Sequence, residues 1–267
     1  MKLLSFFPSI LALVALISSI ESRKIRPTNV PIELFTTKEL DSNHLIRNIL
    51  VVSGIAFSET RFKKESESQV KLFEDISKAG YLTPSLPMIS DTGKGVRYIS
   101  TDEAVINYII LSYNKQLISK NLLEYAISSQ LSAISRNYMK RVASALDSSK
   151  SLVCTALLKI ENIHHALKVL DDAYNTTKYK FLYGDTITYI DLTVYTLALF
   201  IENVSTGCVM SNFHGIRKAT MNISNIPQIY SFENSSYFLS LLVPGTHAFA
   251  KRINFSHSTQ KFSSLAS

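Results

Sequence analysis

Few residue groups in this 267-residue sequence have the types and spacing of a catalytic or metal-binding motif. The six histidines are scattered, and the adjacent pair His164 and His165 would point about 100° apart on a helix, with no third ligand spaced to join them. The glycines around Lys94 lack the Gly-x-x-x-x-Gly-Lys-Ser/Thr spacing of a phosphate loop and suit a hairpin turn. Because no serine elbow or Cys/His signature occurs either, we predict no metal centre and no hydrolase site.

The hydroxyl groups of Thr36 and Thr37 stand where the first predicted strand ends. That strand begins at residue 31, and a helix with apolar residues at helical spacing follows it and stops at Gly54. A second strand is predicted at 55–62. A strand, a helix and a strand within about thirty residues form a βαβ unit, whose strands should be parallel with a right-handed crossover.

The next segment continues the mixed α/β pattern. A charged helix is predicted at 63–78, and two short strands around a glycine-containing turn at 86–99 form a β-hairpin. A further helix starts at Thr101-Asp102. The order of these elements is that of a thioredoxin-like domain, in which the bond before the proline of Leu86-Pro87 would be cis.

From about residue 113 onward the periodicity is helical only. Thr188 and Asp191 stand three apart, the spacing at which a capping box closes a helix N-terminus, and Ile187 and Leu192 are placed for a hydrophobic staple. The helix that follows is apolar on almost every side, so we predict that it is buried and that other helices pack around it.

The stretch Gly184–Asp191, combined with Leu86-Pro87 at this separation, resembles the cytosolic glutathione transferases, most closely their tyrosine-type, sigma-like group. The resemblance covers about Pro31 to Val243. It implies an α/β plus all-α fold: a thioredoxin-like, glutathione-binding domain at 29–112, then the all-helical C-terminal domain at 113–243.

The resemblance also implies where the thiol of glutathione would lie. Tyrosine-type members have a tyrosine near the end of the first strand, whose hydroxyl favours the thiolate. Here Phe35 or Thr36 occupies that position, depending on a one-residue alignment choice, and phenylalanine has no donor. Thr36 or Thr37 would supply the hydroxyl instead, as serine does in other classes. Arg47 matches a frequent structural arginine of the first helix.

The remaining glutathione contacts are implied in the same way. The main chain of Leu86, before Pro87, would pair with the cysteinyl backbone, and Ser85 stands where a side-chain amide is usual. Thr101-Asp102 replaces the Gln/Glu-Ser pair that holds the γ-glutamyl group. The Asp102 carboxylate would repel the α-carboxylate of the ligand but can accept from its α-amino group, or it can act only as a helix cap.

Two functions follow from these expectations. The first is a transferase that binds glutathione as co-substrate, conjugates its thiol to a small apolar electrophile and forms a homodimer. The alternative is a fold that has lost catalysis and acts as a secreted ligand carrier or interaction protein, which the changes at Phe35, Thr101 and Asp102 favour.

The N-terminus predicts processing. Residues 1–22 have a basic start, an apolar run and small residues, as in a signal peptide; an uncleaved signal anchor is the alternative. We therefore expect a secreted or lumenal glycoprotein without stable membrane insertion after cleavage, and five sequons are compatible with this: Asn175, Asn203, Asn222, Asn234 and Asn254.

Cys154 and Cys208 can form one disulfide or stay separate. The net charge of +7 is not gathered in basic blocks, so nucleic-acid binding is not expected, and the serine-rich tail at 244–267 should be loosely held.

Overall fold

The computed structural model describes most of the chain between residues 31 and 239. The described ranges are 31–37, 43–81, 83–119, 121–148, 163–205 and 209–239. The predicted signal peptide, the tail at 244–267 and both cysteines lie outside these ranges.

The N-terminal region is built on a four-stranded sheet with the order β2-β1-β3-β4. β1 pairs in parallel with β2 and antiparallel with β3, and β3 pairs antiparallel with β4. The predicted βαβ unit and the predicted hairpin are therefore both present. The strand bounds are β1 (Ile32–Thr37), β2 (Phe57–Phe62), β3 (Met88–Asp91) and β4 (Val96–Ser100).

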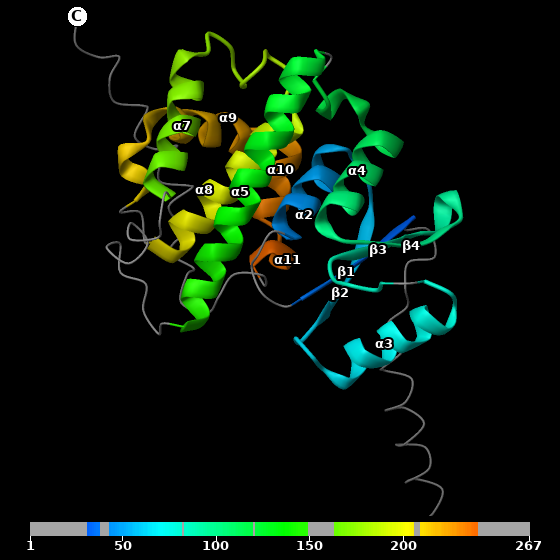
Figure 1. The fold of residues 1–267 in the computed structure, drawn as a ribbon. Coiled ribbons are helices and arrows are strands. Elements are labelled where there is room, and N and C mark those ends of the chain that lie inside the picture. Colours follow the sequence, from blue (N-terminus) through cyan, green and yellow to red (C-terminus); the bar gives the residue numbers. More distant parts are fainter. Residues whose placement is uncertain are drawn as a thin grey trace, which may run out of the picture.

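Helices cover both faces of this sheet (Figure 1). Side chains alternate between faces along a strand, and accordingly Ile32 and Leu34 of β1 join the cluster that includes α2 and α4, whereas Phe35 joins the cluster that includes α3. The helix bounds are α2 (Asn43–Val52), α3 (Glu67–Lys78) and α4 (Asp102–Tyr113).

The second region is helical and lies beside the sheet and its α2–α4 layer (Figure 1). Its helices are α5 (Leu122–Ser148), α7 (Ile163–Thr176), α8 (Tyr189–Ser205), α9 (His214–Ser224), α10 (Pro227–Glu233) and α11 (Ser236–Leu239). Three short 3₁₀ turns complete the described elements: η1 (Thr92–Lys94), η2 (Lys115–Leu117) and η3 (Met210–Asn212). No helix in the described residues has the length and apolar composition needed to cross a membrane.

Helix α8 occupies the centre of the molecule, as its apolar sequence predicts. Every residue from Tyr189 to Ile201 is buried. On the side of α8 that faces α5, α7 and α9, its side chains join the core formed with those helices. Leu192, Tyr195 and Leu199 join the core of the α/β region. A hydrogen bond of 3.3 Å from Asn48 of α2 to Thr196 strengthens that junction. Helix α8 therefore contributes to both hydrophobic cores and joins the two regions.

The predicted capping box is present in altered form. The amide of Thr188 donates to Asp191 Oδ2 at 2.8 Å, which is the expected reach of the acid back to the helix start. The Thr188 hydroxyl, however, donates to the same oxygen at 2.7 Å instead of accepting from an amide. Burial explains the change, because Asp191 is 0% exposed and needs donors that water cannot supply. Ile187 and Leu192 both contact the core, as expected for the staple.

The fold class is confirmed, a small mixed sheet with helices followed by an all-helical region, and the differences are local. β2 begins at Phe57, two residues later than predicted, and α3 begins at Glu67. Within α3, Ile76 is buried and Val70 is 49% exposed.

Candidate functional site

The structure brings the three predicted ligand-contacting segments together at one end of the sheet. Phe35 of β1 pairs with Met88 of β3, and Met88 pairs with Ser100 of β4. These three paired residues form a row across the sheet. Beyond it the chain continues from each strand, as Thr36-Thr37, Leu86-Pro87 and Thr101-Asp102. Segments separated by up to 66 positions in the sequence therefore meet because the strand register places them side by side.

The junction between β3 and α4 is held by a main-chain contact. The Leu86-Pro87 bond is cis, as predicted. The amide of Thr101 donates to the Pro87 carbonyl at 3.0 Å. Thr101 has φ 79° and ψ 144°, a conformation favoured by glycine that costs a threonine about 1–3 kcal/mol. Such strain in a non-glycine residue is concentrated at functional sites, which marks this turn as a candidate.

Thr36 lies inside the protein. Its side chain is 0% exposed, and its hydroxyl donates to the carboxylate of Glu59 on the neighbouring strand. The same carboxylate accepts from Arg47 of α2 through Nη2 at 2.6 Å and Nε at 3.1 Å. The single hydroxyl hydrogen of Thr36 is therefore already used within the protein.

Phe35 and Thr37 point to the other side of β1 from Thr36. The Phe35 ring is 6% exposed and packs against Phe62 and Tyr98, with ring centroids 6.5 and 6.4 Å apart. This places Phe35 in the core between the sheet and α3. Thr37, the last residue of β1, is partly exposed.

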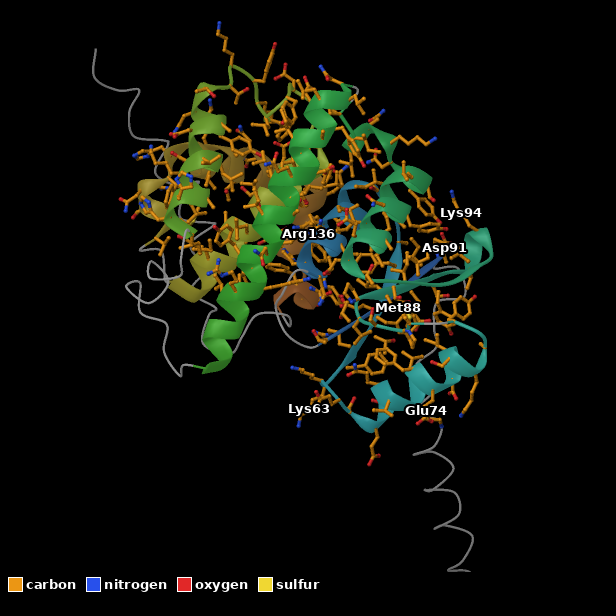
Figure 2. The ribbon with its side chains drawn as sticks, viewed as in Figure 1. Lys63, Glu74, Met88, Asp91, Lys94 and Arg136 are labelled. Atoms are coloured by element: carbon orange, nitrogen blue, oxygen red, sulfur yellow. The ribbon has the colours of Figure 1, made fainter. Side chains whose placement is uncertain are left out.

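The start of α4 contacts the helical region through two ion pairs. Thr101 is the N-cap residue without a side-chain cap hydrogen bond, and Asp102 is the first helical residue. Asp102 Oδ2 lies 3.3 Å from Lys140 Nζ, and Glu103 Oε2 lies 3.0 Å from Arg136 Nη2. Figure 2 shows Arg136 on α5, where the helical region faces the sheet. Basic groups thus compensate the acidic start of α4.

Two residues of this region were not identified from the sequence. The sequence contained a signal for Glu59, because an acid inside a strand whose alternate residues face the core needs a partner there. Lys140 had none, since only the packing of α5 on α4 brings its ammonium group to Asp102. Ser85, predicted beside the ligand, is half-buried next to Leu86.

The described residues contain no group of three or more metal-ligating side chains that could hold an ion. Elsewhere, Asp91 is fully buried and accepts hydrogen bonds from Tyr108 at 2.8 Å and from Tyr113. Burial and the Asp91 carboxylate raise the pKa of Tyr108 to about 12. Figure 2 places Asp91 away from Met88 along β3, so these tyrosines are not part of the site.

Comparisons with known proteins agree with this architecture. Residues 134–236 match the family model described as glutathione S-transferase, C-terminal domain. The structure of NaGST-2 aligns with a TM-score of 0.61 at 14% identity, over 77% of this chain and 96% of that one. Rat hPGDS complexed with a quinoline aligns with a TM-score of 0.58 at 14% identity, over 75% and 94%. A search of curated proteins gives no match. The chain therefore has the fold of these solved structures, a thioredoxin-like region followed by an all-helical region, and residues 134–236 of its helical region are similar to the C-terminal domain of glutathione S-transferases.

Proposed function

We propose that the chain binds glutathione at this end of the sheet and conjugates it, through its thiol sulfur, to a small apolar electrophile. The observation that carries the proposal is the convergence of three features there: the main chain at Leu86, the strained turn at Thr101, and the charged pair of Asp102 and Lys140. The main chain of Leu86 and the charged pair each suit a different part of the tripeptide.

The main chain of Leu86 suits the cysteinyl residue of the ligand. Within the described residues no main-chain hydrogen bond engages the amide or carbonyl of Leu86. An extended peptide can pair with such groups as an added strand, and this pairing requires no particular side chain at Leu86.

Asp102 and Lys140 suit the γ-glutamyl end, which carries an ammonium and a carboxylate. The Asp102 carboxylate can accept from the ammonium group, while Lys140 Nζ, 3.3 Å away, offers a positive charge to the carboxylate. The repulsion expected from Asp102 alone is therefore offset by its partner. Asp102 is 16% exposed, so the pair is partly shielded from solvent on that side.

We assign the thiol contact to Thr37. The Thr36 hydroxyl already donates to Glu59, so it holds the Arg47–Glu59 pair at the strand end. Thr37 is partly exposed at the end of β1. A hydroxyl that donates to the sulfur stabilises the thiolate and lowers its pKa, which promotes attack on an electrophile.

Calorimetric titration with glutathione and a conjugation assay with 1-chloro-2,4-dinitrobenzene test the proposal. We expect Lys140→Met to weaken glutathione binding about tenfold, the loss of one charge-assisted contact. Lys168→Met is the matched control, because Lys168 is similarly exposed and ion-paired but lies on α7. Absence of glutathione binding by the folded wild-type chain, or equal effects of the two variants, would contradict the proposal.

Two threonine variants separate binding from turnover. Thr37→Val should lower the conjugation rate with little change in glutathione affinity, because only the hydroxyl is removed. Thr36→Val should instead lower stability, because it leaves Glu59 without one of its donors. An unchanged rate in Thr37→Val would remove the assigned thiol contact.

We also propose that the chain enters the secretory pathway and forms a homodimer. Residues 1–22 and the exposed sequons Asn175 and Asn234 support the first statement. Large apolar side chains exposed on α4 and α5 support the second: Leu111, Leu122, Leu123 and Ile127. N-terminal sequencing and glycosidase treatment of the protein expressed in a eukaryotic host test the secretory route, and an uncleaved, unglycosylated product would refute it.

A further inference from the structure

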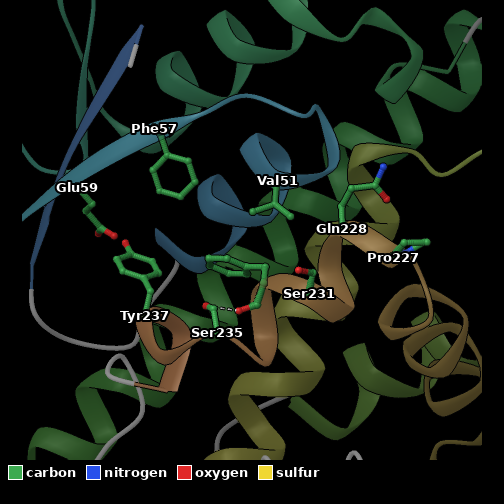
Figure 3. Close-up of a pocket in the computed structure, with 9 residues that line it drawn as sticks. Val51, Phe57, Glu59, Pro227, Gln228, Ser231, Ser235 and Tyr237 are labelled. Carbon is green, nitrogen blue, oxygen red and sulfur yellow. Dashed lines mark hydrogen bonds between the residues drawn. The ribbon is translucent and has the colours of Figure 1, made fainter. Parts of the chain in front are cut away.

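A cavity opens on another part of the molecule, away from Leu86 and Thr101. It has a volume of about 720 Å³ and opens between α2 and β2 on one side and α10 and α11 on the other (Figure 3). Val51 and Phe57 on its wall belong to the end of α2 and the start of β2. Phe57 pairs with Ile32, the first residue of β1, so this wall is at the opposite end of the strand from Thr37.

The walls of this cavity are aromatic. Phe57 and Tyr237 meet edge to face, with ring centroids 6.4 Å apart, and Tyr237 lies 5.9 Å from Phe232. Figure 3 shows the Phe57 and Tyr237 rings next to each other on one side of the cavity, with Gln228 and Ser231 on the other side. Rings that contact each other at these angles present both ring faces and ring edges on the cavity wall, where a planar guest can pack.

The α10 side of the cavity packs against a side chain of α2. The imidazole of His44 on α2 stacks on Phe232, with centroids 6.2 Å apart and an angle of 21°, and lies 5.2 Å from Phe238. His44 is 3% exposed, and burial together with the nearby Arg47 lowers its pKa to about 3, so the ring is neutral. A wall held by packed rings is preorganised, which reduces the entropic cost of binding.

The cavity offers no uncompensated charge of its own. Among the described lining residues Glu59 is the one acid, with no Lys or Arg beside it, and its carboxylate is bound by Arg47 and Thr36. The Arg61 guanidinium lies 5.8 Å from the Tyr237 ring centroid and is not part of the lining. The other polar groups are neutral: Gln228, Ser231 and Ser235, all on or next to α10. Apolar walls with a few neutral hydrogen-bonding groups are typical of small-molecule sites, whose usual volumes are about 300–1,000 Å³.

We propose that this cavity is a binding site for a flat, uncharged aromatic molecule, separate from the glutathione site. The rings of Phe57, Phe232 and Tyr237 would enclose the guest, and the α10 hydroxyls and amide would orient it. The proposal does not depend on catalysis at the sheet end, because none of the proposed glutathione contacts (Thr37, Leu86, Asp102 and Lys140) lines this cavity.

Titration of the full chain with the uncharged dye Nile red tests this site by fluorescence. We expect saturable one-site binding whose affinity is unchanged by excess S-hexylglutathione, the probe for the proposed glutathione site. Phe57→Ala and Tyr237→Ala should each weaken binding about tenfold through loss of ring contacts. Tyr230→Ala is the matched control, because Tyr230 is an exposed ring of α10 that does not line the cavity.

A filling variant keeps the test valid if Phe57→Ala fails to fold. Ser231→Phe adds a ring at an exposed lining position of α10, so it should abolish dye binding while thermal unfolding stays near that of the wild type. Non-saturable binding, displacement by S-hexylglutathione, or wild-type affinity in the folded Ser231→Phe variant would overturn the proposal.

Discussion

The carboxylate of Asp191 shows how a single buried acid can organise the start of a helix. Besides the two bonds from Thr188, it accepts from the Tyr174 hydroxyl at 2.8 Å and from the Leu182 amide at 3.0 Å. These donors come from α7 and from the loop before α8. Burial raises the pKa of Asp191, and the four hydrogen bonds oppose that rise. The residue therefore connects three parts of the chain.

We expect Asp191→Ala to lower the free energy of unfolding by about 3 kcal/mol, because it leaves buried donors of Thr188, Leu182 and Tyr174 without an acceptor. Urea unfolding followed by circular dichroism measures this. Asp185→Ala is the control, since Asp185 is exposed and its carboxylate accepts from the amide of Lys180. A loss under about 1 kcal/mol for Asp191→Ala would contradict the assignment.

The Arg47–Glu59 pair is a second residue-scale determinant. Both side chains are almost completely buried, at 1% and 0% exposure. The attraction between two such charges is offset by the loss of their hydration, so the pair adds little net stability. Removing one of the two side chains destabilises the protein strongly, because the other charge then remains buried without its partner.

A double-mutant cycle distinguishes these two effects. Arg47→Met should cost about 3–5 kcal/mol, whereas adding Glu59→Gln, which keeps an acceptor for Thr36, should restore part of the loss. The coupling should reach about 2 kcal/mol in urea unfolding experiments. Strictly additive losses would show that the two groups do not interact.

At the scale of elements, α10 is attached to the central helix by a buried polar contact. The Tyr195 hydroxyl of α8 donates to the carboxylate of Glu233, the last residue of α10. Burial raises the pKa of Glu233 from 4.5 to about 7, although the Tyr195 hydrogen bond opposes the shift. The folded protein thus binds a proton here more tightly than the unfolded chain does.

This shift predicts a pH dependence of stability. A carboxyl whose folded pKa is raised contributes stability below its unfolded pKa, and that contribution is lost as the pH rises through the folded value. Between pH 4.5 and about 7, wild-type stability should therefore fall relative to Glu233→Gln, by roughly 2–3 kcal/mol. Urea unfolding of both proteins at pH 5, 6, 7 and 8 measures the difference, and parallel pH curves would rule it out.

At the scale of the whole molecule, the apolar side chains on α4 and α5 remain uncovered in the single chain. Leu122 is 82% exposed and Leu123 is 67% exposed at the start of α5, and Leu111 of α4 is 54% exposed. Clustered exposed leucines are typical of an interface. Burying them against a second copy would remove this apolar surface from water.

We expect Leu122→Glu with Leu123→Glu to convert the proposed dimer to monomer, because a dimer would bury two charges per chain. Light scattering coupled to size exclusion measures the mass. Val169→Glu is the control, since Val169 is a 45% exposed apolar residue of α7, away from that face. A wild-type protein that is monomeric at micromolar concentration would refute the dimer.

Much of the fold could be predicted because the deciding interactions are local. Alternation along β1 and β3, helical periodicity in α2 and α4, and the spacing of Thr188 and Asp191 each involve residues within one or two turns of each other. The continuous apolar composition of α8 likewise predicts its burial. Fewer details of the site were predictable. Neither the Arg47–Glu59 ion pair next to Thr36 nor the Asp102–Lys140 ion pair has a short-range pattern in the sequence.

By itself, the sequence determined the order of strands and helices, the central buried helix and the segments that meet at the sheet end. Only the tertiary structure decided which groups remain available there. The Thr36 hydroxyl is used by Glu59, and the charge of Asp102 is balanced by Lys140, 38 positions away. The aromatic cavity was likewise invisible in the sequence, because its walls come from α2, β2, α10 and α11. The reason is physical. The periodicity of hydrophobic residues, which predicts helices and strands, depends on residues close together in the chain. Hydrogen-bond partners and cavities depend instead on which distant surfaces pack together.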